Sequence, residues 1–263
     1  MRYFLQLRYK GTNYHGWQIQ HNAVSVQQIV NESLSKVLHQ AVETTGCGRT
    51  DTGVHAEQFY AHFDVSTPLD NTRRLIGKLS SMRIPGVDFQ EFFQVHDQAH
   101  ARFDAISRTY EYRIIRSRNP FLTELAHYVY GPLDVELMNA ESKALIGKND
   151  FGAFSKSGTQ VKTNICNITE AHWFMCGEQL VFKITADRFL RNMVRAIAGT
   201  LIETGQGKRK PENLLRVIES KSRSSAGMSV PACGLFLTEI VYPYTLQKPD
   251  ESQKPEQSDS KKI

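Results

Sequence analysis

The stretch GCGRTDTGVHA, residues 46–56, is the most informative part of this sequence. It is too rich in glycine and threonine for a helix interior and too polar for a buried strand, so it is predicted to be a loop. Its three glycines offer backbone angles that other residues avoid, which indicates that the loop holds a definite shape. Because it also presents Arg49 and Asp51 two positions apart, we expect it to form a site.

The composition is that of an ordinary globular protein with a sizeable core. The chain has 263 residues, of which 40% are hydrophobic, and its formal net charge is +5. The positive charge is concentrated in a few arginine-rich segments: 73–74, 108–118, 188–195 and 207–210. Such clusters favour a phosphate backbone as partner, with a solvated surface as the alternative explanation.

No apolar run in the sequence approaches the length of a membrane span. The opening residues MRYFLQLRY alternate in polarity, which predicts a strand instead of a signal peptide. The four cysteines form no C-x-x-C pair. This spacing favours free thiols in a reducing cytoplasm over disulfides or a zinc site, so we expect a cytoplasmic protein without a bound metal.

Hydrophobic periodicity predicts two successive α+β units. The first contains a strand at 2–9, a helix capped by Ser25, and then a strand at 58–65, a helix at 70–82 and a strand at 88–95. The second contains strands at 107–116, 167–175, 179–187 and 234–243, with helices from Asp134, at 188–204 and from Pro211.

This pattern divides the chain into three parts. Residues 1–104 form an N-terminal α+β half with the loop, and residues 105–246 form a C-terminal α+β half. Residues 247–263 contain no apolar side chain before Ile263, so they are predicted to be disordered.

The loop sequence GRTDTGVHA closely resembles the signature of the TruA family of tRNA pseudouridine synthases. Four further segments occur in the order and spacing of that family: SRTYEYRI at 107–114, KNDFGAFSKSG at 148–158, FLRNMVRAIAGTL at 189–201 and GLFLTEIVYP at 234–243. Together the similar segments span the chain from residue 2 to about residue 245.

The resemblance implies a fold, a substrate and a reaction. The fold is α+β, with two ferredoxin-like halves joined through a continuous, mostly antiparallel sheet and a basic cleft between them. The family acts as a homodimer on the anticodon arm of tRNA. It converts uridine to pseudouridine at positions 38, 39 and 40 without a cofactor.

The resemblance also implies roles for individual residues. Asp51 corresponds to the catalytic nucleophile, and Arg195 to its positive partner. Arg49 corresponds to the residue that fills the space left by the flipped base, and Tyr110 to the residue that contacts the target uracil. From the residues alone, Asp51 is alternatively a turn-stabilising side chain and Tyr110 an ordinary packed strand residue.

The chemistry of the reaction suits these residue types. The N1–C1′ bond of uridine breaks and C5 joins C1′, so no electrons or groups come from outside and no cofactor is needed. A carboxylate can act as the nucleophile, by attack on C1′ or after abstracting a sugar proton. The base must leave its stack, and the ring of Tyr110 offers an aromatic face to receive it.

Basic residues around the helix predicted at 188–204 are candidates for RNA contacts. Arg188, Arg191 and Arg195 are three and four positions apart, which places them on one helix face. We expect Arg195 to lie deepest, and Arg188, Arg191 and Lys208 to meet phosphates. At 191–192 this chain has Arg-Asn where many members of the family have Tyr-His.

Two other functions are compatible with parts of the sequence. Asp51, His55 and His62 are acceptable zinc ligands for a metal-dependent hydrolase, but no HExxH-like spacing or second carboxylate follows. An RNA-binding protein without catalysis accounts for the arginines. It does not account for Asp51, Tyr110 and Arg195 together.

Overall fold

The computed structural model describes residues 1–156, 158 and 162–248. The first half of the chain contributes β1 (Arg2–Tyr9), α1 (Val26–Leu38), β2 (Thr45–Gly46), β3 (His55–Asp64), α2 (Thr72–Ser81) and β4 (Val87–Val95). Ser25 caps α1 as predicted, because its hydroxyl accepts a hydrogen bond from the backbone N–H of Gln28. Val30 and Leu34 of the same helix are fully buried against the sheet.

The second half contributes the remaining elements. They are β5 (Ser107–Ile115), β6 (His127–Tyr128), α3 (Val135–Ser142), β7 (Gly147–Asp150), β8 (Ile165–Cys176), β9 (Gln179–Ala186), α4 (Met193–Gly205), α5 (Asn213–Ser220) and β10 (Leu235–Val241). The carboxylate of Asp134 accepts the backbone N–H of Leu137 and so begins α3 at the predicted position.

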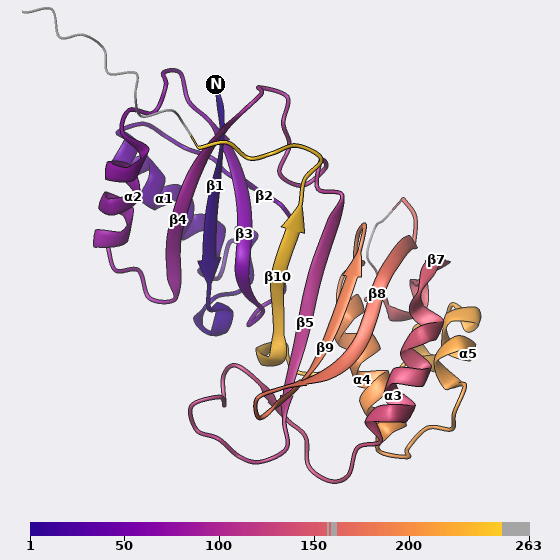
Figure 1. Cartoon of the computed structure of the whole chain (residues 1–263). Helices are drawn as coiled ribbons and strands as arrows, with labels where there is room; N and C mark the ends of the chain where they lie inside the picture. Colours follow the sequence, from indigo (N-terminus) through magenta and orange to yellow (C-terminus); the bar gives the residue numbers. More distant parts are fainter. Residues whose placement is uncertain (157, 159–161, 249–263) are drawn as a thin grey trace, which may run out of the picture.

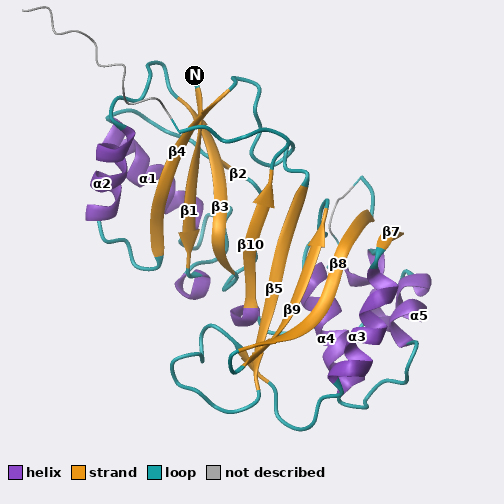
Figure 2. Ribbon diagram, in the orientation of Figure 1, coloured by secondary structure: helices purple, strands orange, loops and turns teal. Residues whose placement is uncertain are grey.

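All ten of these strands belong to one sheet, in the order β4-β1-β3-β10-β5-β9-β8-β7, with β2 paired to β3 and β6 to β5 (Figure 1). The pairs β3–β10 and β5–β6 are parallel and the others are antiparallel. The helices form two groups, α1 and α2 beside one end of the sheet and α3, α4 and α5 beside the other (Figure 2). This is the open, continuous α+β sheet that the sequence predicts.

Strand β10 joins the two halves of the sheet. It comes from the C-terminal half, yet Phe236 and Leu237 pair in parallel with His55 and Ala56 at the start of β3. On its other side Leu237 pairs with Tyr110 of β5. Only β10 therefore separates the residues that follow the loop at 47–54 from the strand that carries Tyr110.

The helix predicted at 188–204 starts later than expected. Asn192 has a φ of 67°, in the left-handed region, so α4 begins at Met193. The side-chain amide of Asn192 donates to the hydroxyl of Ser229 at 2.5 Å, a long-range contact that helical periodicity does not reveal. Arg188 and Arg191 consequently lie in the segment before the helix, and the prediction that they share a helix face with Arg195 is wrong. Similarly, α5 starts at Asn213, two residues after the proline expected to open it.

The end of the chain is described only as far as Lys248. Gln247 forms a β-bridge with Gln94 of β4, and Lys248 pairs with Glu91 at 2.5 Å. The first two residues of the segment predicted to be disordered therefore contact the sheet, and 249–263 lie outside the described residues. None of the helices in the described ranges is long and apolar enough to cross a membrane.

Candidate active site

The loop between β2 and β3 packs closely against the first half of the protein. A Cβ at Gly46 would lie 2.5 Å from the indole nitrogen of Trp17, so only glycine fits there. Gly53 has a φ of 79°, a backbone conformation that glycine adopts without strain. The space around Gly48 is open. Two of the three glycines are therefore required by the shape of the loop.

Hydrogen bonds on both sides of Asp51 hold this loop in place. The hydroxyls of Thr50 and Tyr9 lie 2.8 Å apart in a buried contact. The backbone N–H of Trp17 donates to the carbonyl of Thr50, and that of Gly53 donates to the carbonyl of Tyr14. These bonds fix the backbone on both sides of Asp51.

The carboxylate of Asp51 lies between two arginines from the second half of the chain. Its Oδ2 is 3.6 Å from Arg195 and its Oδ1 is 3.6 Å from Arg191. These separations permit electrostatic attraction but are too long for hydrogen bonds. The two guanidinium groups thus attract the carboxylate while leaving its lone pairs available for chemistry.

Arg195 is the more firmly held of the two arginines. Its Nε donates to the carbonyl of Val230 at 2.8 Å, and the N–H of Val230 donates back to the carbonyl of Arg195 at 3.2 Å. The Arg195 side chain is 22% exposed, whereas that of Arg191 is 56% exposed. Arg195 is therefore a fixed partner of Asp51, and Arg191 is a more solvent-accessible one.

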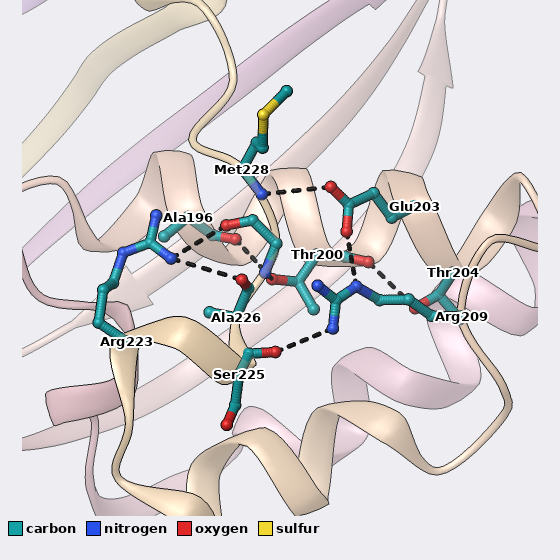
Figure 3. Close-up of polar contacts among 10 residues, drawn as sticks. Ala196, Thr200, Glu203, Thr204, Arg209, Arg223, Ser225, Ala226 and Met228 are labelled. Atoms are coloured by element: carbon teal, nitrogen blue, oxygen red, sulfur yellow. Dashed lines mark hydrogen bonds and ion pairs between the residues drawn. The ribbon is translucent and has the colours of Figure 1, made fainter.

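A polar network attaches the segment before Val230 to α4 (Figure 3). Thr200 accepts the N–H of Gly227 at 2.8 Å, and Glu203 accepts the N–H of Met228 at 3.2 Å. Glu203 also pairs with Arg209 at 2.6 Å. Sequence reasoning missed this segment, although a glycine in the middle of α4, Gly199, marks where its backbone comes close.

Tyr110, on β5, lies close enough to Asp51 for the two side chains to interact electrostatically. Its ring is almost fully buried and meets the ring of Phe189 edge-on, with centroids 5.1 Å apart. Burial is the main cause that raises the pKa of its phenol well above the usual value; Asp51 acts in the same direction and Arg108 in the opposite one. The hydroxyl has no hydrogen-bond partner among the described residues, so it is a protonated donor available to a substrate.

Arg108, which the sequence analysis did not select as a site residue, holds the loop at 47–54 through hydrogen bonds. Its guanidinium donates to the carbonyls of Cys47, Arg102 and Asp187, at 2.9, 2.5 and 3.1 Å. Cys47 is buried, which raises the pKa of its thiol to about 12, so it is not a nucleophile at neutral pH. The signal for Arg108 in the sequence is only its position two residues before Tyr110.

The other predicted RNA contacts are distributed unevenly. Arg49 is exposed on the loop, and Arg188 donates to the carbonyl of Thr163 at 3.1 Å. Lys208 is exposed just beyond the C-terminal end of α4, whereas Arg195 lies in its first turn. At 1.5 Å per residue this separation is roughly 20 Å along the helix. The structure therefore does not bring Lys208 to Asp51.

The two histidines considered as metal ligands are occupied by backbone groups. Nδ1 of His55 accepts the N–H of Gly11 at 3.0 Å, and its Nε2 lies 3.1 Å from the carbonyl of Cys233. Nδ1 of His62 accepts the N–H of Ala101 at 3.2 Å. Within the described part of the chain, no three His, Cys, Asp or Glu residues are grouped so as to hold a metal ion.

Comparison with known proteins identifies the class of enzyme to which this fold and site correspond. Residues 142–243 match the family model described as tRNA pseudouridine synthase. The chain is 49% identical over 245 residues to tRNA pseudouridine synthase A of Bacteroides thetaiotaomicron, covering 92% of this chain and 91% of that protein. It is 46% identical to tRNA pseudouridine synthase A of Parabacteroides distasonis, with 93% and 97% covered.

A more distant relative extends the same similarity. The chain is 39% identical to tRNA pseudouridine synthase A 2 of Clostridium perfringens, with 90% of this chain and 98% of that protein covered. These matches include both the loop with Asp51 and the segment with Arg195. The chain belongs to the tRNA pseudouridine synthase A family.

Proposed function

We propose that this protein isomerises uridine to pseudouridine in the anticodon arm of tRNA, at positions 38, 39 and 40, with Asp51 as the nucleophile. The observation that carries the proposal is the carboxylate of Asp51 within 3.6 Å of Arg195 and Arg191. The names of the relatives give tRNA as their substrate. The loop, the arginines and Tyr110 supply the groups that this isomerisation requires.

In this proposal the enzyme acts on a uridine that has left its stack. The carboxylate of Asp51 acts on the ribose, the N1–C1′ bond breaks, and the uracil turns until C5 faces C1′. The C5–C1′ bond then forms and C5 loses its proton, so the product is an isomer of the substrate. The reaction uses no external electron or group donor, which is why we propose that it needs no cofactor.

Each neighbouring side chain has a role in this sequence of steps. Arg195 supplies a positive charge next to the carboxylate when the base excludes water. Tyr110 contacts the flipped uracil, and its unpartnered hydroxyl is available to hydrogen bond to it. The exposed Arg49 enters the space that the base has left. Arg188 is positioned for a phosphate, whereas Lys208 would contact RNA only at a distance from the reaction.

We also propose that the protein acts as a homodimer in the cytoplasm. Phe121 and Tyr130, on either side of β6, are 87% and 82% exposed, which is unusual for large aromatic side chains. A second copy of the chain would cover them. The four cysteines are unpaired, as a reducing compartment favours.

The central test is the substitution Asp51→Ala. A methyl group cannot act on the sugar, so turnover should fall on the order of 10⁴-fold or more. Release of tritium from C5-labelled tRNA measures the reaction directly. Binding should persist, because phosphate contacts supply most of the affinity for tRNA.

The melting temperature of the Asp51→Ala protein is the control for this test. Asp51 makes no short side-chain hydrogen bond among the described residues, so the melting temperature of the variant should match that of the parent protein. Measurable isomerisation by a folded Asp51→Ala protein would show that Asp51 is not the nucleophile. Intact tRNA binding without isomerisation by the unmodified protein would favour the non-catalytic RNA-binding alternative.

A further inference from the structure

A group of unpaired arginines lies beside the candidate active site, at the end of the sheet where β3 finishes and β5 begins. Arg108 brings these arginines close together, because its guanidinium donates hydrogen bonds to backbone carbonyls of three separate segments. These segments carry Arg49, Arg102 and Arg188. We call Arg49, Arg102 and Arg188 the arginine group.

The charges of the arginine group act on one another. Burial lowers the pKa of Arg102, and the positive charges of Arg49, Arg108 and Arg188 lower it further. None of these four side chains forms an ion pair with a carboxylate in the portion of the chain that the structure describes. The nearest acids are engaged locally, since Asp187 accepts the backbone N–H of Arg188 at 2.7 Å. An unneutralised concentration of guanidinium groups favours a bound anion.

An exposed aromatic ring adjoins the arginine group. Phe103 is 73% exposed, although it follows Arg102 directly and lies in a segment bounded by buried alanines. The ring of His100 packs against it with centroids 4.2 Å apart, and the guanidinium of Arg102 is 5.6 Å from its centre.

Hydrogen bonds within its own segment hold the backbone around Phe103 in place. Nδ1 of His100 accepts the backbone N–H groups of Arg102 and Phe103, at 3.1 and 3.2 Å. Asp104 accepts the N–H of His100 at 2.7 Å and the hydroxyl of Tyr244 at 2.9 Å. The turn is therefore rigid, and it holds an apolar ring in solvent beside positive charge.

We propose that Phe103 and the arginine group form a nucleotide subsite that holds an unpaired RNA base next to the flipped uridine. The base stacks on the open surface of Phe103, and its phosphate lies beside Arg102 and Arg188, while Arg49 enters the adjoining space left by the flipped uridine. An aromatic face combined with guanidinium groups is the usual recognition mode for single-stranded RNA.

This subsite rests on the proposed function for the identity of the RNA and for the flipped uridine beside it, whereas RNA binding at Phe103 does not depend on the reaction. Because Arg108 ties its segments to the carbonyl of Cys47, four residues before Asp51, occupation of the subsite would position the RNA relative to the nucleophile. Phe103 is thus a positioning residue. It touches a neighbouring nucleotide and not the reacting atoms.

The first test measures binding of a fluorescein-labelled RNA hairpin with the sequence of an anticodon arm. Phe103→Leu keeps an apolar side chain but removes the aromatic face, so affinity should fall about ten-fold. Phe103→Trp restores a face and should bind within about two-fold of the parent protein. Equal affinity of the Leu, Trp and parent proteins would overturn the stacking proposal.

The second test reports stacking itself. A hairpin carrying 2-aminopurine beside the target uridine should lose fluorescence on binding the parent protein and the Trp variant. The loss should be much smaller with Phe103→Leu at saturating protein. Identical quenching by all three proteins would contradict the subsite.

The phosphate part of the proposal has its own variant and control. Arg102→Gln should weaken binding and reduce the slope of log affinity against log salt by about one. Arg216→Gln, at an exposed site on α5, should leave the slope unchanged. An unchanged slope for Arg102→Gln would show that Arg102 contacts no phosphate and belongs only to the solvated surface.

Binding and isomerisation can fail separately in these experiments. If the parent protein forms no pseudouridine but Phe103→Leu still loses affinity, the subsite stands and the proposed reaction is wrong. If the parent protein forms pseudouridine and Phe103→Leu binds RNA normally, the reaction stands and the subsite is wrong.

Discussion

At the scale of single residues, the two arginines beside Asp51 are not equivalent. Both lie 3.6 Å from the carboxylate, but only Arg195 is anchored to a second group, the carbonyl of Val230. An ion pair between exposed side chains contributes about 1 kcal/mol or less, because water and salt screen it. A partly buried and pre-oriented charge contributes much more to a transition state.

We therefore expect Arg195→Gln and Arg191→Gln to differ. The first should lower the single-turnover rate on the order of 100-fold, as loss of a pre-oriented charged partner does. The second should lower it less than about five-fold, which corresponds to about 1 kcal/mol. Rapid-quench measurement of pseudouridine formation compares them, and equal losses would show that exposure does not separate their roles.

His62 predicts how stability depends on pH. Burial is the main cause that lowers the pKa of His62, to about 4. Below pH 6.5 the unfolded chain therefore binds a proton that the folded chain does not, so stability falls as the pH drops toward 4. Between pH 7.5 and pH 5 the loss at this residue is roughly 2 kcal/mol.

Urea unfolding at the two pH values measures this effect. His62→Gln retains an acceptor for the N–H of Ala101 and should remove about 2 kcal/mol of the pH dependence. The exposed His21, changed to Gln, serves as the matched control and should leave the dependence as it was. The assignment is wrong if both variants behave like the parent protein.

At the scale of elements, the close approach of α4 to the segment 226–230 controls the position of Arg195. A Cβ at Gly199 would overlap the carbonyl of Met228, whereas a Cβ at Gly77 in α2 would meet open space. Glycine to alanine favours a helix by roughly 0.5–1 kcal/mol when nothing obstructs the methyl group. The same substitution in the two helices should therefore have opposite effects.

Gly77→Ala should raise the melting temperature slightly and leave turnover unchanged. Gly199→Ala should lower both, because the displaced segment carries the carbonyl that fixes Arg195. Differential scanning calorimetry and single-turnover kinetics measure the two properties. A Gly199→Ala protein with full stability and activity would mean that the segment yields without moving Arg195.

The elements also show which parts of the structure can be read from the sequence. The Ser25 cap and the alternation along β5 are local, and both were predicted correctly. The start of α4 was not, because Phe189 and Leu190 continue the apolar pattern into a segment that is not helical. The bonds from Arg108 to Cys47 cross 61 positions, and no local pattern contains such information. The proposed catalytic residues came from a resemblance to a family, and their roles remain predictions.

At the scale of the whole molecule, the sheet is continuous across the two halves, and we propose that these divide at residues 104 and 105. The proposed nucleophile comes from one half, and Tyr110 and Arg195 come from the other. The exposed Phe121 and Tyr130 lie in the second half, away from the arginine group. Catalysis and assembly can therefore be tested with separate variants.

For the proposed homodimer, the double substitution Phe121→Ser and Tyr130→Ser should produce a monomer in sedimentation experiments. Loss of large apolar contacts weakens association, while the fold should persist because both side chains are exposed. Met175→Ser, at an exposed site on β8, is the control and should remain dimeric. An active monomer of the parent protein at assay concentrations would contradict the dimer.

The central position of β10 has a consequence for how the protein is made. It is the last of the described strands to leave the ribosome, yet it fills the gap between β3 and β5. Until residues 235–241 emerge, the nascent chain presents two unpaired strand edges and lacks the strand that joins the half with Asp51 to the half with Arg195. Translation arrest before this point would release an inactive and aggregation-prone fragment. The two halves of the proposed site can therefore come together only after the final strand has been synthesised.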